Sequence, residues 1–114
     1  MHVSVLDGST TIGTANFDHL DPPMGVAWGV FTPSAQYSRD KHAGCIEGNY
    51  VEGFDRELVV HAEGYGLIER VRIVVEDSTQ LFGEVHLSAY FADGRDYEAF
   101  FSEHDDFKAY WKPD

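Results

Sequence analysis

The sequence predicts an α+β fold: a mostly antiparallel sheet of six or seven strands with two short helices. Three observations lead to this fold class. Apolar residues mostly recur with a period of two, which is typical of strands. Short turn-like segments separate the predicted strands, and they favour antiparallel pairing because parallel strands need long crossovers. Aromatic residues take up helical spacing near the C-terminus. A small half-open β-barrel is the alternative, because Gly13, Gly29 and Gly83 permit strong curvature.

Residues 3–17 predict the first hairpin. Val3 and Val5 begin one alternating run, and residues 10–17 form the next. The connection Asp7-Gly8-Ser9 suits a tight turn, because glycine adopts positive φ at little steric cost. We therefore expect two strands that pair with each other.

The middle of the chain predicts one further strand, a helix and a loop. Two prolines interrupt residues 18–25, since proline cannot donate to a ladder. Residues 26–32 resume as an apolar strand, in which Gly29 indicates a bulge or a close approach between backbones. A threonine–proline pair predicts the N-cap and first turn of a short helix over residues 32–37. Residues 38–56 are polar and contain several glycines, so we expect a long surface loop there.

The second half predicts a four-strand meander followed by a helix. Alternating runs bounded by turn residues place the strands at 57–61, 69–76, 83–91 and 96–101. The segment Ser102-Glu103-His104-Asp105 approximates a capping box and precedes aromatic residues at helical spacing. A final short helix that packs on the sheet is expected.

Alternation divides this meander into two faces. The apolar face predicts the core and contains Leu58, Val60, Val71, Ile73, Val75, Val85, Leu87, Ala89, Phe91, Tyr97, Ala99 and Phe101. The other face is mixed, and its polar members are the candidate binding residues His61, Arg72, Glu76, His86, Tyr90 and Glu98. A solvated face, a binding surface, or a cluster for catalysis or metal binding would each explain this composition. A fourth possibility is a homodimer that buries Val59, Val74 and Phe100.

Composition limits the classes of function. Residues 1–114 suit one globular domain, because 43% of them are hydrophobic and 14% are aromatic. Twenty acidic residues against eight basic ones give a formal charge of -12, which argues against nucleic-acid binding and favours a basic partner. The only cysteine, Cys45, precludes an internal disulfide, and no signal or membrane segment is evident, so we expect a cytoplasmic protein without a membrane partner.

No motif predicts a catalytic, metal or cofactor site. His42 and Cys45 have a spacing seen in zinc sites, but the chain offers no second pair. The same two residues could form a thiol and base, with Asp40 as the orienting group, but a loop is a poor scaffold for such a pair. The dipeptide His104-Asp105 is explained by the capping box.

The sequence therefore favours a small acidic module that binds or regulates a basic protein, in the manner of an immunity protein or an inhibitor. The motivation is strong negative charge on a compact domain without catalytic motifs. A small-ligand-binding domain or minor enzyme that uses the polar face is one alternative. An oligomeric structural subunit is the other.

Overall fold

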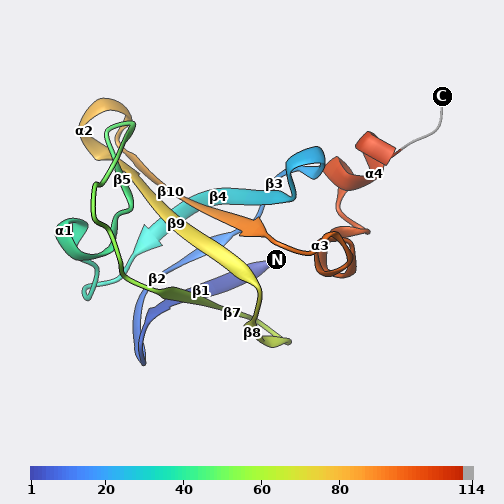
Figure 1. Ribbon diagram of the computed structural model, residues 1–114, viewed down its shortest axis with the longest axis horizontal. Helices are drawn as coiled ribbons and strands as arrows, with labels where there is room; N and C mark the ends of the chain where they lie inside the picture. Colours follow the sequence, from blue (N-terminus) through green and yellow to red (C-terminus); the bar gives the residue numbers. More distant parts are fainter. Residues whose placement is uncertain (112–114) are drawn as a thin grey trace.

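The computed structural model describes residues 1–111 and has the predicted α+β class, with a mainly antiparallel sheet (Figure 1). This part of the chain has ten strands instead of six or seven: β1 (His2–Asp7), β2 (Thr10–Asn16), β3 (His19–Asp21), β4 (Val26–Pro33), β5 (Cys45–Ile46), β6 (Asn49–Tyr50), β7 (Leu58–Ala62), β8 (Gly66–Ile68), β9 (Val71–Ser78) and β10 (Glu84–Phe91). It has four α-helices instead of two, and a 3-10 turn: α1 (Arg39–His42), α2 (Thr79–Phe82), α3 (Gly94–Phe101), α4 (Asp105–Trp111) and η1 (Pro22–Met24).

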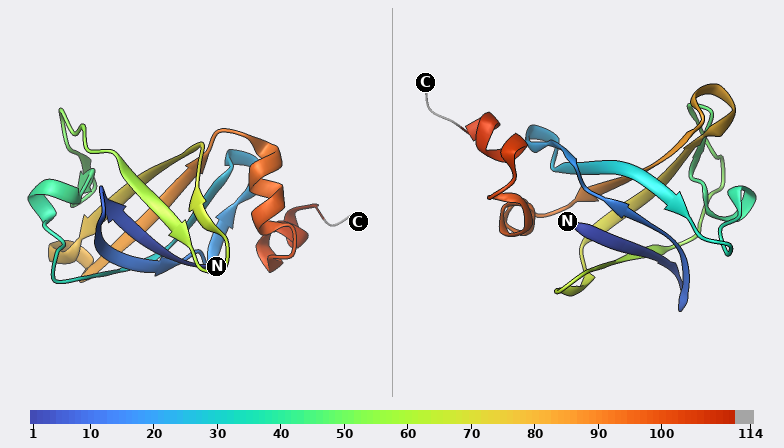
Figure 2. Two further views of the ribbon diagram at one scale, coloured as in Figure 1. Left: turned by 90° about the horizontal axis from the view of Figure 1, so that it is seen from below. Right: turned by 180° about the vertical axis from the view of Figure 1, so that it is seen from behind.

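The sheet is one continuous path that curls but stays open. Its strand order is β6-β5-β9-β10-β4-β2-β1-β7-β8, with β3 beside β4, and within residues 1–111 only the β5–β9 pair is parallel. Strands β8 and β9 are separated by only two residues in sequence, yet they are not hydrogen-bonded neighbours in the sheet. The curl brings β7 back into contact with β9 (Figure 2). The two sides of the opening therefore lie close together without forming a ladder.

The predicted meander is wrong in its pairing. Strands β9 and β10 form the expected antiparallel pair, but β7 pairs with β1 and β8. The reason is local: Gly64 and Gly66 have φ of 80° and 107°, so the chain reverses immediately after β7 and β8 occupies its edge. Arg70 then adopts φ of 56°, and this left-handed residue turns the chain away before β9 begins.

The predicted strand over 96–101 is helix α3. The Asp93 carboxylate accepts a hydrogen bond from the Arg95 backbone N–H at 2.8 Å, which caps the helix. Tyr97 and Phe101 both face the core, as the strand pattern also predicted, because a spacing of four residues satisfies both periodicities. Ala99 is exposed, which is inconsistent with the strand and consistent with a helix.

The predicted helix over 32–37 is also wrong. Strand β4 continues through Pro33, which lies opposite Gly13 of β2. The Ser34 N–H then donates to the Ile12 carbonyl at 2.8 Å, extending the contact between these strands. The N-cap signal was misleading because the tertiary ladder satisfies the same backbone groups that a helix would satisfy.

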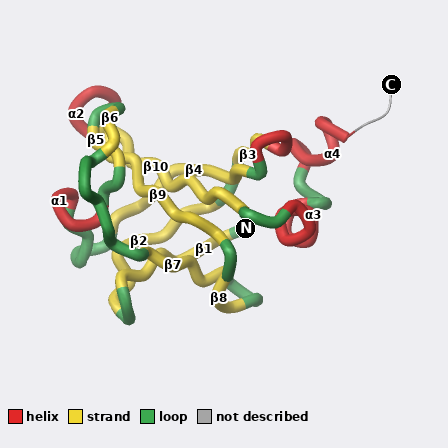
Figure 3. Tube along the Cα trace, viewed as in Figure 1, coloured by secondary structure: helices red, strands yellow, loops and turns green. Residues whose placement is uncertain are grey.

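The predicted loop over 38–56 contains α1 and the β5–β6 hairpin. Glu47 and Gly48 have φ of 50° and 82°, the geometry of a two-residue hairpin turn. Strand β5 lies parallel to the end of β9, with Cys45 opposite Glu76. From β6 the chain runs down to β7 as an irregular segment over residues 51–57 (Figure 3).

The core fills the inside of the curl, and the predicted apolar face belongs to it except for Ala99. Phe101 of α3 lies edge-on to Phe17 and Phe91, with ring centroids 6.1 and 5.6 Å apart, so α3 closes one end of the core. At the same end, the Tyr97 hydroxyl donates to the Val26 carbonyl at 3.0 Å. Burial raises the pKa of Tyr97 to about 12. The hydroxyl is therefore a neutral donor at all ordinary pH values.

Candidate functional site

Four of the six predicted site residues gather on the outward side of β9 and β10, which we call the outer face. Arg72 lies directly opposite Tyr90 across these strands, and Glu76 lies opposite His86. The Arg72 guanidinium stands 5.3 Å from the centroid of the Tyr90 ring, a cation–π arrangement. The alternation along both strands accounts for this grouping, because residues two apart share a face.

The polar groups of the outer face are engaged with one another. Ser88 donates a hydrogen bond of 2.7 Å to the Glu76 carboxylate, and His86 lies 3.2 Å from Glu84. Burial raises the pKa of Tyr90, and the neighbouring Glu76 carboxylate adds to this effect. A raised pKa keeps the phenol protonated, so Tyr90 is suited to donating a hydrogen bond and not to acting as a base.

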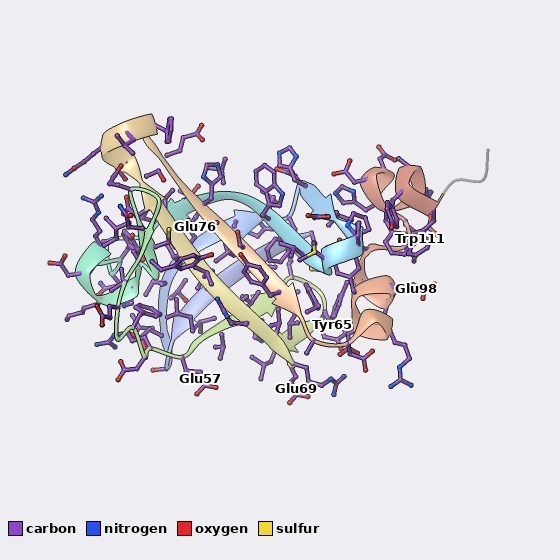
Figure 4. The ribbon with its side chains drawn as sticks, turned by 45° about the horizontal axis from the view of Figure 1, so that its top comes forward. Glu57, Tyr65, Glu69, Glu76, Glu98 and Trp111 are labelled. Atoms are coloured by element: carbon purple, nitrogen blue, oxygen red, sulfur yellow. The ribbon has the colours of Figure 1, made fainter. Side chains whose placement is uncertain are left out.

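The other two predicted residues lie elsewhere. His61 is on β7 and pairs with Ser4 and Leu67, so β4, β2 and β1 separate it from β10 along the sheet. Glu98 is on α3 at the helical end of the molecule, apart from Glu76 (Figure 4). Its placement is a consequence of the misassigned strand over 96–101. These two residues do not complete the predicted site.

The apolar residues proposed for a dimer contact are covered by the chain itself to different extents. Val74 is only 7% exposed, and a Cβ placed on Gly44 would lie 3.3 Å from its side chain. Phe100 is partly buried against the core and lies edge-on to Tyr65. Val59 is half-buried. Val59, Val74 and Phe100 lie on β7, β9 and α3, and none of them is fully exposed, so they do not form the exposed apolar stripe that the dimer hypothesis requires.

The opening of the sheet holds a groove of about 940 Å³. We call this opening the seam; β9 borders it on one side, and β7 and β8 border it on the other. Leu58, Ile68 and Ile73 line it and also belong to the core, so its floor is apolar. Residues 54–57 of the irregular segment form part of its wall. Among the six predicted residues only Arg72 lines this groove, because the sequence pattern carries no information on which strand edges remain open.

The rim of the seam carries carboxylates without basic partners. Asp55, Glu57 and Glu69 line the groove, are exposed, and form no ion pair within residues 1–111. Two arginines of the groove are already neutralised: Arg56 binds Asp7 at 2.6 Å, and Arg70 binds Asp96 at 2.8 Å. We call Asp55, Glu57 and Glu69 the acidic rim; Figure 4 shows Glu57 and Glu69 pointing outward along the same edge.

A buried polar network fixes α1 and the β5–β6 hairpin beside the seam. Asp77 is 3% exposed and accepts hydrogen bonds from the Tyr37 hydroxyl at 2.6 Å and from the Thr79 N–H at 3.1 Å. Arg39 lies 3.7 Å from Asp77 and also binds Glu47. Burial raises the pKa of Asp77, but the hydrogen bonds from Thr79 and Tyr37 outweigh this and lower it overall. Tyr37 and Asp77 lie 40 positions apart, so no local pattern indicates the network.

His42 and Cys45 do not form a catalytic pair. The Ser38 N–H donates to Nδ1 of His42 at 2.9 Å, and Nε2 lies 3.1 Å from the Asp7 carboxylate. Because Nδ1 accepts, Nε2 carries the proton and donates to Asp7. Both ring nitrogens are therefore occupied, and neither is free to take a proton from Cys45.

Cys45 is expected to react slowly with thiol reagents in the folded protein. It is 5% exposed, and burial together with the nearby Glu76 carboxylate raises its pKa, so little thiolate is present. Reaction with Ellman's reagent should be at least about tenfold slower in buffer than in denaturing urea, because it requires local opening. Equal rates in both conditions would show that the thiol is accessible.

Residues 1–111 contain no grouping of three or more His, Cys, Asp or Glu side chains that could hold a metal ion. No helix in the same part of the chain is long and apolar enough to span a membrane. Comparison with protein-family models, curated proteins and solved structures found no match.

Proposed function

We propose that this protein is a binding module that recognises a basic protein partner. The observation that carries the proposal is the charge of the segment leading into β7 and through the β7–β8 hairpin. Over residues 51–69 it has five exposed carboxylates without an ion pair in the described chain, namely Glu52, Asp55, Glu57, Glu63 and Glu69. Arg56 is the single lysine or arginine in this range, and it is already paired with Asp7.

Such a surface favours a positively charged partner for two physical reasons. Unpaired carboxylates on one edge repel each other, and a basic partner relieves this repulsion. Their summed field also steers a basic molecule during encounter, which raises the association rate and makes binding sensitive to salt. The adjoining apolar groove supplies area that can be removed from water once the partner has arrived. The charge and the groove together therefore favour protein recognition at the seam over catalysis on the outer face.

The proposal predicts that this protein captures a partner, and that capture depends on the salt concentration and on the carboxylates beside the seam. Immobilised wild-type protein should retain a specific basic protein from the source lysate at low ionic strength and release it at about 0.5 M salt, where screening is strong. The double variant E57K/E69K should lose this protein, because it reverses two charges beside the groove.

The matched control is Glu98→Lys. Glu98 is exposed on α3, outside the seam, so this variant should retain the partner as the wild type does. A protein retained equally by all three forms, or retained without regard to salt, would contradict the proposal.

A further inference from the structure

We infer that the basic partner binds as an extended segment, which adds a strand to the free edge of β9 inside the seam. This inference rests on the proposed function and specifies its mode. An exposed sheet edge offers backbone donors and acceptors to any extended chain, and addition of a strand is a common form of peptide recognition.

The free edge of β9 is identified by its hydrogen bonds. The Gly44 N–H donates to the Val75 carbonyl at 3.0 Å, and the Glu47 N–H donates to the Asp77 carbonyl at 2.8 Å. Residues two apart in a strand direct their backbone groups to the same side. Val71 and Ile73 therefore direct their N–H and C=O groups toward the seam, as Val75 does.

These groups of Val71 and Ile73 have no backbone partner within residues 1–111. On the other side of β9, the Ala92 N–H donates to the Arg70 carbonyl. This bond confirms that the backbone N–H and C=O groups of even-numbered residues point toward β10. Strand β5 pairs only with Glu76 and Asp77, so it leaves the first half of the edge open. The edge is thus long enough for about three to five residues of an added strand, at roughly 3.3 Å per residue. Because β7 contacts β9, the two sides of the seam must move apart where the added strand enters.

The walls of the seam define the side chains of that strand. In an added strand, alternate side chains point inward and outward. Inward residues meet the apolar floor of Leu58, Ile68 and Ile73. Outward residues lie beside the acidic rim, where three carboxylates face one arginine, Arg72, that has no ion pair in the described chain. A segment that alternates β-branched apolar and basic residues satisfies both requirements.

A second copy of this chain is a poor occupant. Each copy carries a formal charge of -12, and the strand edge of one copy would bring its acidic rim against the other. Like charges so placed oppose association. The charge complementarity therefore favours a basic segment of another protein over self-association.

The probe is the fluorescein-labelled hexapeptide Lys-Val-Lys-Val-Lys-Val. Two versions carry backbone N-methyl groups, one on the lysines and the other on the valines, so charge and side chains are unchanged while one edge loses its N–H donors. One of the two methylated peptides should bind at least about tenfold more weakly than the parent, because an edge facing β9 loses its hydrogen bonds. The other methylated peptide should bind nearly as well as the parent.

Amide exchange measured by NMR locates the added strand. With the parent peptide at about 100 times its dissociation constant, the amides of Val71 and Ile73 should exchange up to about 100-fold more slowly than in the free protein. The Glu98 amide should show no added protection, because α3 lies outside the seam.

The outcomes separate the two proposals. If the parent and both methylated peptides bind equally, or if Val71 and Ile73 gain no protection in the complex, strand addition is overturned while recognition of a basic partner stands. If neither these peptides nor hexalysine bind at low salt, and the lysate yields no salt-sensitive basic partner, both proposals fail.

Discussion

Replacing Gly29 with alanine is expected to lower the free energy of unfolding by about 3 kcal/mol, because the added methyl group has no room. An ideal Cβ on Gly29 would lie 1.7 Å from the backbone oxygen of Asn16. The obstacle is main chain, so no side-chain rotation can relieve it, and the end of β2 must move away from β4 at Gly29. Urea denaturation monitored by circular dichroism measures the loss.

Gly94→Ala is the matched control. Apart from its own helical turn and its chain neighbours, no described residue comes within 4 Å of a Cβ placed on Gly94, which begins α3. The stability of Gly94→Ala should therefore stay within about 0.5 kcal/mol of the wild type. A Gly29→Ala protein as stable as the Gly94→Ala protein would mean that the close approach of β4 to Asn16 is wrong.

Removing the Asp77 carboxylate should cost a similar amount. Asp77→Ala leaves the Tyr37 hydroxyl without its acceptor and deprives Arg39 of a nearby carboxylate in a buried setting. The expected loss is about 3 kcal/mol, typical of breaking a buried charged network by deleting one partner. Ser78→Ala, at the neighbouring position, is the control, because no side-chain hydrogen bond of Ser78 contributes to this network. Equal midpoints for the two variants in urea would contradict the role assigned to Asp77.

Asp77 should also make the stability of the protein depend on pH. The pKa of Asp77 is lowered in the folded protein relative to its ordinary value of 3.8. A lowered folded pKa means that the carboxylate stabilises the fold above the unfolded pKa, and that this contribution is lost as pH falls through the folded value. Wild-type stability should therefore decline below about pH 4, and Asp77→Asn should show a shallower decline. Parallel pH profiles for the two proteins would refute this assignment.

Local periodicity predicted the apolar face of the core apart from Ala99, and it predicted the outer-face grouping of β9 and β10 but not the separate positions of His61 and Glu98. Arg72, Glu76, His86 and Tyr90 lie together because β9 and β10 are long, regular and joined by a short connection. Helix α3 was missed because its buried Tyr97 and Phe101 are four residues apart, which fits either periodicity. The Asp93 cap is the local signal for this helix, but an Asp-Gly pair at residues 93–94 is equally typical of a hairpin turn.

The seam could not be predicted, because it depends on which strand occupies an edge. Strand β8 has only three residues, yet by pairing with β7 it prevents β9 from doing so. Asp77 and Tyr37 are 40 positions apart, and their contact with Arg39 and Glu47 holds the hairpin at one end of β9. Both features are products of tertiary contacts and have no periodic signature in the sequence. The excess of carboxylates in the second half was visible, but the structure alone places three of them around one groove.

The most direct test of the account is the affinity of the labelled Lys-Val hexapeptide for three forms of the protein, measured by fluorescence anisotropy. At about 50 mM salt, where surface charges are weakly screened, the wild type and Glu98→Lys should bind with dissociation constants within about twofold of each other. The E57K/E69K variant should bind at least about tenfold more weakly, and the difference should shrink at about 0.5 M salt. Equal affinity of all three forms at low salt would contradict recognition of a basic segment at the acidic rim of the seam.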